Sequence, residues 1–175
     1  MEIIKMIALA LSAILLLTAC SPNDSYSLEY QEHPLRALLA FEHSGISVTA
    51  LLSIIPKSNS DGVIERDVTL TFRSPNSLAG ITIEQTGGNI YTSCGDLKIS
   101  DSAADAWLEV AELFNIDGTI KRIYISDIQG QDYNCVEALG NDGKDYKIYL
   151  HENGEPRRIV SPSLTVDVLS FESAQ

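Results

Sequence analysis

The stretch VTLTFRSPNSLAGITI, residues 68–83, decides the fold class of this chain. Val68, Leu70 and Phe72 alternate with threonine and arginine, and isoleucines flank a threonine at residues 81–83. Alternation with a period of two is typical of a strand that buries one face. Proline, asparagine, serine and glycine separate the two runs, which favours a turn between them. The stretch therefore predicts two neighbouring antiparallel strands.

The same signals recur on both sides of this stretch. Further alternating runs lie at residues 146–150 and 164–168, and turn sequences lie at 58–62, 86–89, 141–143 and 153–154. Residues 35–41 fit a short helix or a first strand, and the turn and β-rich run that follow them favour a strand. Short strands joined in order by tight turns predict an antiparallel meander.

One segment has the periodicity of a helix. Between Ser102 and Asn115 the apolar residues that recur at helical spacing are Ala103, Ala106, Trp107, Val110, Leu113 and Phe114. The opposite side carries acidic residues, so the segment is amphipathic. A wide apolar stripe needs an apolar surface to cover, and the sheet is the surface available. We predict an α+β fold: an antiparallel β-meander with one packed amphipathic helix at about 102–115.

The order of these elements resembles the lipoprotein-carrier (LolA-like) superfamily. Two stretches carry the resemblance: residues 68–83, and residues 146–159 with their continuation into 164–171. The resemblance implies a curved, half-open, barrel-like sheet over helices and the binding of a lipid. Members of the superfamily hold acyl chains with dispersed apolar side chains, so the resemblance assigns no individual binding residue.

The N-terminus matches the signal sequence of an exported bacterial lipoprotein. Residues 7–17 are apolar except for one serine, and they end in Leu-Thr-Ala-Cys at residues 17–20. This apolar run is too short to span a bilayer. We therefore predict a cleaved signal peptide at 1–19, a lipid attached to Cys20, and a linker over 20–34. A single domain over 35–175 would then be anchored at the extracytoplasmic face of the cell membrane.

The charge of the chain limits the partners it can bind. Lysine and arginine number 12 against 24 aspartates and glutamates, which gives a formal net charge of −12. An acidic protein repels phosphate backbones and anionic headgroups, so we expect no nucleic-acid partner. The lipid on Cys20, rather than electrostatic attraction, would hold the protein at the membrane.

No catalytic or metal-binding motif occurs in the sequence. The three histidines, His33, His43 and His151, lack the spacing of a metal site, and no Gly-x-Ser-x-Gly motif is present. We therefore predict a protein that is not an enzyme and that needs no cofactor. Two functions remain: binding of a hydrophobic ligand between sheet and helix, or interaction with an envelope partner through the surface of a protein whose core is filled.

Two aromatic residues distinguish these two functions, and two cysteines raise a separate question about a disulfide. Trp107 and Phe114 would line a hydrophobic pocket in the first case and would be ordinary core residues in the second. Cys94 and Cys135 lie in β-rich segments, and an oxidising compartment would allow them to form a disulfide. The alternative for this pair is two separate thiols.

Overall fold

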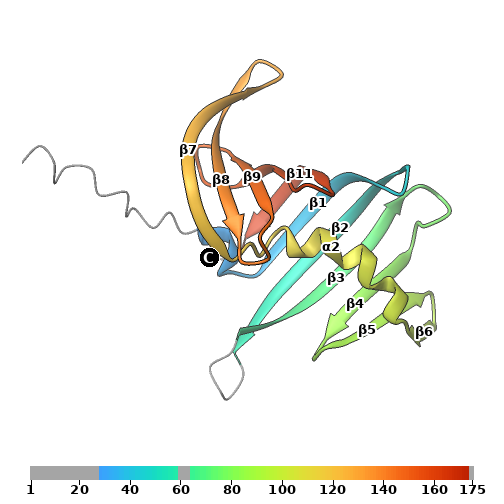
Figure 1. Cartoon of the computed structure of the whole chain (residues 1–175). Coiled ribbons are helices and arrows are strands. Elements are labelled where there is room, and N and C mark those ends of the chain that lie inside the picture. Colours follow the sequence, from blue (N-terminus) through green and yellow to red (C-terminus); the bar gives the residue numbers. More distant parts are fainter. Residues whose placement is uncertain (1–27, 59–63, 174–175) are drawn as a thin grey trace, which may run out of the picture.

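The structure is a computed structural model that describes residues 28–58 and 64–173 (Figure 1). Its strands are β1 (Leu35–His43), β2 (Ile46–Ser58), β3 (Ile64–Ser74), β4 (Ile81–Thr86), β5 (Asn89–Cys94), β6 (Leu97–Ser100), β7 (Gly118–Ile128), β8 (Gln131–Gly140), β9 (Asp145–Leu150), β10 (Pro156–Val160) and β11 (Thr165–Ser173). The helices are the 3-10 turns η1 (Glu29–Gln31) and η2 (Ser102–Ala104) and the α-helix α2 (Asp105–Glu112). The predicted signal peptide, Cys20 and the turn at 58–62 fall wholly or mostly outside the described residues.

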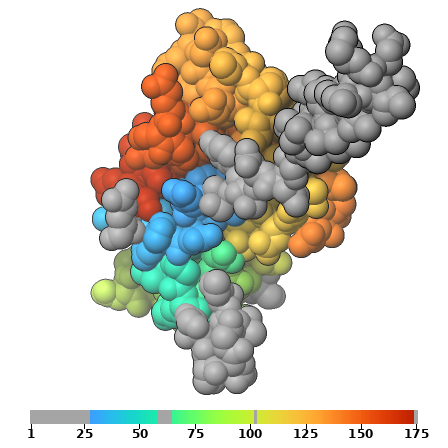
Figure 2. All heavy atoms as spheres, turned by 90° about the vertical axis from the view of Figure 1, so that its left-hand side faces the viewer, coloured from blue at the N-terminus to red at the C-terminus, as the bar shows by residue number. Residues whose placement is uncertain are grey.

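The strands form one antiparallel sheet that is not closed. Their order is β6-β5-β4-β3-β2-β1-β11-β10-β9-β8-β7, so sequence neighbours pair throughout and β1 pairs with β11 at the centre. Figure 2 shows this central region from the side, with β1 in blue beside β11 in red and the β7–β8 hairpin in orange above them. The predicted meander is confirmed, and so is the choice of a strand for residues 35–41.

The connection between the two edges of the sheet requires the sheet to curve. The chain leaves β6 at one edge and enters β7 at the other, and residues 101–117 make the crossing. Eight residues of α2 at about 1.5 Å each, three of η2 at about 2.0 Å and six extended ones at about 3.4 Å reach about 38 Å. Eleven strands at about 4.8 Å spacing would make a flat sheet about 48 Å wide. The edges must therefore bend toward each other, and the bend creates an inner face.

Alternating side chains fill that inner face. Leu39 in β1 lies opposite Ala50 in β2, and Ala50 lies opposite Phe72 in β3. All three are at most 2% exposed, and each alternates with residues on the outer face. Because side chains of paired residues point to the same face, the register aligns the apolar positions of neighbouring strands into one core.

The predicted helix is present and shorter than 102–115. A 3-10 turn precedes it, where the Asp101 carboxylate accepts a hydrogen bond from the Ala103 amide at 3.0 Å. The helix buries Leu108, Val110 and Ala111, whereas the predicted contact residue Ala106 is exposed. Val110, Leu113 and Phe114 are buried and Trp107 packs on the core, so the predicted apolar side is confirmed except at Ala103 and Ala106. Eight residues are too few for a stable isolated helix, so its packing on the sheet holds it in place.

Glycines make the tight hairpins that the sequence predicted. Gly87 and Gly88 have φ values of 53° and 75° in the β4–β5 turn, in the left-handed region that L side chains rarely adopt.

Within the described residues, no helix is long and apolar enough to cross a membrane.

Candidate functional site

The inner face beneath and beside α2 is the candidate ligand site, and Trp107 lies at its rim. The Trp107 ring packs against His43 with ring centroids 4.3 Å apart and meets Phe72 edge to face at 4.9 Å. The indole is partly exposed and contacts the core from one side. Trp107 is therefore in contact with the apolar surface that the sequence assigned to it, and aromatic neighbours occupy the space beside its ring.

Phe114 lies deeper and has other neighbours. It is 1% exposed and meets Tyr30 edge to face at 6.4 Å, and Tyr30 in turn meets Phe171 at 5.9 Å. Tyr30 precedes β1, and Phe171 lies near the end of β11, so this cluster joins the two ends of the described chain to the segment after α2. Phe114 is therefore a core residue. Its aromatic neighbour is Tyr30, whereas those of Trp107 are His43 and Phe72.

Three buried polar atoms on residues of this cluster or next to it have no partner of normal hydrogen-bond geometry among the described residues, although the Gln31 side chain is close enough to Tyr30 to act on the pKa of its hydroxyl. They are the Tyr30 hydroxyl, Gln31 Nε2 and Asn115 Oδ1. Burial raises the pKa of Tyr30, which keeps its hydroxyl protonated and able to donate. A buried polar group normally has a partner, so these atoms mark a place where water or a polar group of a ligand would be stabilised. The sequence analysis gave no indication of these atoms.

The apolar inner face continues beyond α2 to both edges of the sheet. On β6, Leu97 and Ile99 are 66% and 48% exposed, and their pairing with β5 places them on the inner face. On β7, Ile123 and Ile125 are 43% and 70% exposed, and Ile123 lies opposite the buried Val136. Apolar side chains therefore reach the solvent at each end of the inner face.

Of the two alternatives for Cys94 and Cys135, the structure has two separate thiols. Cys94 and Cys135 are free thiols. Cys94 ends β5 and Cys135 lies in β8, and seven strands separate β5 from β8 in the sheet. Cys94 is exposed and pairs with Ile81 on the inner face, whereas Cys135 is buried on the outer face between Tyr124 and Tyr149. Two thiols on opposite faces of distant strands cannot come within bonding distance.

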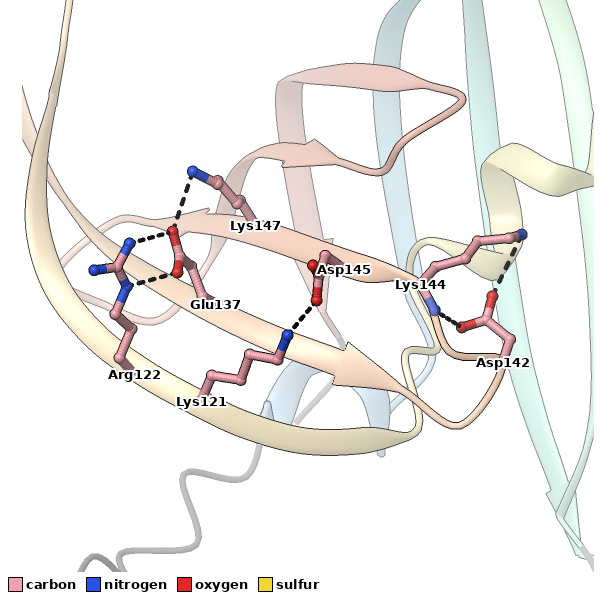
Figure 3. Close-up of polar contacts among 7 residues, drawn as sticks. All are labelled: Lys121, Arg122, Glu137, Asp142, Lys144, Asp145 and Lys147. Atoms are coloured by element: carbon pink, nitrogen blue, oxygen red, sulfur yellow. Dashed lines mark hydrogen bonds and ion pairs between the residues drawn. The ribbon is translucent and has the colours of Figure 1, made fainter.

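The outer face carries a compact ionic network centred on Glu137 (Figure 3). Arg122 donates to the two Glu137 carboxylate oxygens at 2.6 and 3.0 Å, the Tyr124 hydroxyl donates at 2.9 Å, and Lys147 Nζ lies 3.1 Å away. These hydrogen bonds, with that from Arg122 the largest cause, lower the pKa of Glu137 to about 2. Next to this network, a register shift between Ile120 and Arg122 leaves Lys121 as an extra residue of β7. The Lys121 Nζ donates a hydrogen bond of 2.5 Å to Oδ1 of Asp145.

Two of the three histidines pack against aromatic rings in the structure. His43 packs on Trp107, and His151 meets Tyr133 edge to face with centroids 5.2 Å apart. Among residues 28–58 and 64–173, no group of three or more histidine, cysteine or acidic side chains is placed to hold a metal ion.

Comparisons with known proteins identify the architecture. No protein-family model matches the chain, and no curated protein matches it. Among solved structures, an uncharacterized conserved protein from Thermus thermophilus is similar with a TM-score of 0.50 and 11% identity, over 84% of this chain and 82% of that one. MucB is similar with a TM-score of 0.50 and 15% identity over 89% of this chain. This chain covers 60% of the MucB chain.

A LolA superfamily protein from Nitrosomonas europaea is similar at a TM-score of 0.44 and 13% identity, over 85% of this chain and 92% of that one. The other two proteins are 11% and 15% identical to this chain, and at these identities structural similarity shows the fold alone. The fold of this chain is therefore similar to the folds of MucB and of the Thermus protein.

Proposed function

We propose that this chain is an exported lipoprotein, anchored at the extracytoplasmic face of a membrane through Cys20, that binds an apolar ligand on the inner face of its sheet. The signal-like residues 1–19 support the location, and the sequence resemblance of residues 68–83 and 146–171 to the lipoprotein-carrier superfamily supports the ligand class. The observation that carries the binding proposal is the incomplete cover of the apolar inner face by α2.

The size of the helix explains why the cover is incomplete. Eight helical residues are about 12 Å long, whereas the inner face extends across eleven strands. The isoleucines of β7 remain exposed at one end, and Leu97 and Ile99 remain exposed at the other. Exposed apolar side chains are common singly, but here they continue a buried core, as expected of a surface that receives a ligand.

The buried polar atoms near Phe114 suggest the chemistry of the ligand. The Tyr30 hydroxyl and the Gln31 amide can donate hydrogen bonds, and the Asn115 carbonyl can accept one. None of these atoms has a partner among the described residues. An amphiphile with an apolar chain and a small polar end, such as a fatty acid, would satisfy both features. The partners are then the membrane, through the lipid, and a small hydrophobic molecule.

The second candidate function is surface interaction by a protein with a filled core, and a specific observation favours it. Leu108, Val110 and Phe114 are at most 3% exposed between α2 and the sheet. Such packing resembles an ordinary interior. If the packing between α2 and the sheet does not open, no ligand can enter the core. The protein would then act by binding an envelope partner on its surface.

Fluorescence of the only tryptophan separates the two functions. Residues 21–175 are titrated with a long-chain fatty acid, and ligand binding is expected to change the Trp107 emission. Ile123→Asp is expected to weaken binding because it places a charge on the inner face. Ile55→Asp is the matched control, since Ile55 is 48% exposed on the outer face of β2. Unchanged emission, together with no co-purifying lipid by mass spectrometry, would favour the filled-core function.

A further inference from the structure

An open pocket of about 420 Å³ lies on the outer face of the sheet, opposite to the face that carries α2. Its lining residues are Lys121, Arg122, Glu137, Ala138, Asp145, Tyr146, Lys147, Val160, Ser161 and Pro162. Arg122, Glu137, Lys147 and Val160 form one transverse row across β7, β8, β9 and β10. The pocket is within the size range of small-molecule sites.

The charge of this pocket is opposite to that of the chain. Three cations and two carboxylates give the ten lining residues a net charge of +1, whereas the whole chain has −12. One quarter of the 12 lysines and arginines therefore lie in one pocket. An anion is therefore stabilised better in this pocket than over a surface with the average charge of the chain.

The Glu137 network holds two of these cations in fixed positions. The carboxylate is 15% exposed and receives Arg122, Tyr124 and Lys147 together, so its own charge is largely compensated. Arg122 uses two of its five N–H groups on Glu137, and the ammonium of Lys147 has one such contact among the described residues. Both side chains therefore retain donors for a further acceptor. The hydrogen bonds to Glu137 also raise the pKa of Arg122 and of Lys147, which keeps both side chains charged.

The third cation is held less firmly. Lys121 contacts Asp145 at 2.5 Å, and both side chains are substantially exposed, at 45% and 71%. Exposed ion pairs contribute little to stability, so an anionic ligand can replace Asp145 as the partner of Lys121. Val160 and Pro162 provide an apolar wall beside the cations.

We propose that this pocket binds a tetrahedral oxyanion, namely a phosphate group, carried by a small molecule or by a lipid headgroup. Three donors from Lys121, Arg122 and Lys147 match an anion with three or more acceptor oxygens better than a carboxylate with two. The site is on the opposite face from the proposed apolar ligand, and it does not depend on that ligand.

An NMR titration of the full chain in a non-ionic detergent tests the site with inorganic phosphate at constant ionic strength. Amide signals of β7 and β9 are expected to shift saturably with phosphate and less with acetate. Lys121→Met is expected to weaken phosphate binding about tenfold, on the order of one charge-assisted hydrogen bond, and it leaves the Glu137 network intact. Lys98→Met is the matched control, because Lys98 also pairs with a carboxylate at 2.5 Å and is 51% exposed. This control is expected to bind phosphate normally.

Two probes distinguish the sources of the phosphate. Binding of dihexanoyl phosphatidic acid more tightly than inorganic phosphate, with the same dependence on Lys121, assigns a lipid headgroup. Tighter binding of inorganic phosphate assigns a soluble phosphate. Absence of saturable shifts with both probes would overturn the proposal, as would equal weakening by Lys121→Met and Lys98→Met.

Discussion

Arg122 and Glu137 lie opposite each other on β7 and β8 and form a two-point contact, with Nε 2.6 Å from Oε2 and Nη2 3.0 Å from Oε1. Fork-shaped contacts of this kind fix the orientation of both side chains. Together with the Tyr124 hydroxyl and Lys147, this contact lowers the pKa of Glu137 from its ordinary value of 4.5 to about 2.

The lowered pKa predicts how stability depends on pH. A carboxyl whose pKa is lower in the folded state stabilises the fold above its unfolded pKa, and this contribution is lost as the pH falls toward 2. Glu137→Gln is expected to lower the free energy of unfolding at pH 7 and to flatten its decrease between pH 4.5 and 2, as measured by urea denaturation. Glu84→Gln, which alters an exposed pair with Lys98, serves as the control. Parallel pH profiles for wild type and Glu137→Gln would contradict the prediction.

Phe114 is predicted to be one of the residues that stabilise the helix–sheet core. Phe114→Ala is expected to lower the free energy of unfolding by about 3–5 kcal/mol, because it leaves a cavity among buried side chains. Leu169→Ala removes an apolar side chain that is 53% exposed, so its effect is expected within about 0.5 kcal/mol. Similar midpoints of thermal unfolding for the two variants would show that Phe114 is not packed as described.

The buried hydroxyl of Tyr30 is predicted to destabilise the ligand-free protein. Tyr30→Phe removes a polar atom without a partner among the described residues, so the free energy of unfolding is expected to stay unchanged or to rise by about 1–2 kcal/mol. Tyr146→Phe is the matched control, because its hydroxyl donates to Asp142 at 2.8 Å and its loss is expected to destabilise by about 1 kcal/mol. A loss of stability in Tyr30→Phe as large as in Tyr146→Phe, measured by urea denaturation, would contradict this prediction.

The lipid anchor is predicted from residues 17–20 and is tested in cells. Cys20→Ser is expected to abolish incorporation of a radioactive fatty acid and to leave the precursor uncleaved, because the thiol is the acceptor of the lipid. Cys94→Ser retains the predicted acceptor and is expected to be labelled like wild type. Equal labelling of Cys20→Ser and wild type would end the hypothesis.

The elements of this fold could be predicted from local patterns where one face of an element is buried. Val68, Leu70 and Phe72 alternate because β3 has a solvated side, and the glycines at 87 and 88 identify the hairpin after β4. The apolar periodicity also located α2, although it assigned Ala106 to the buried side. Ala106 lies in the first turn of α2, where the helix end is exposed, and the apolar period alone does not show how far along the helix the sheet covers it.

The relations between distant strands could not be predicted in this way. The proposed pairing of Cys94 with Cys135 required the order of strands across the whole sheet, and a local pattern carries no such information. The proposed phosphate pocket could not be predicted for the same reason. Lys121 lies on β7 and Lys147 on β9, and β8 lies between these two strands in the sheet. The three unpartnered polar atoms near Phe114 also come from segments far apart in the sequence.

The pairing of β1 with β11 has a consequence for the order of assembly. The first and last strands of the described chain meet at the centre of the sheet, so strands β1–β6 and β7–β11 form two blocks joined through this seam and the residue 101–117 connection. The seam cannot form until residues 165–173 have been synthesised. A nascent chain that lacks β11 would therefore expose Leu39 and Phe41 of β1 at an unfinished edge of the sheet.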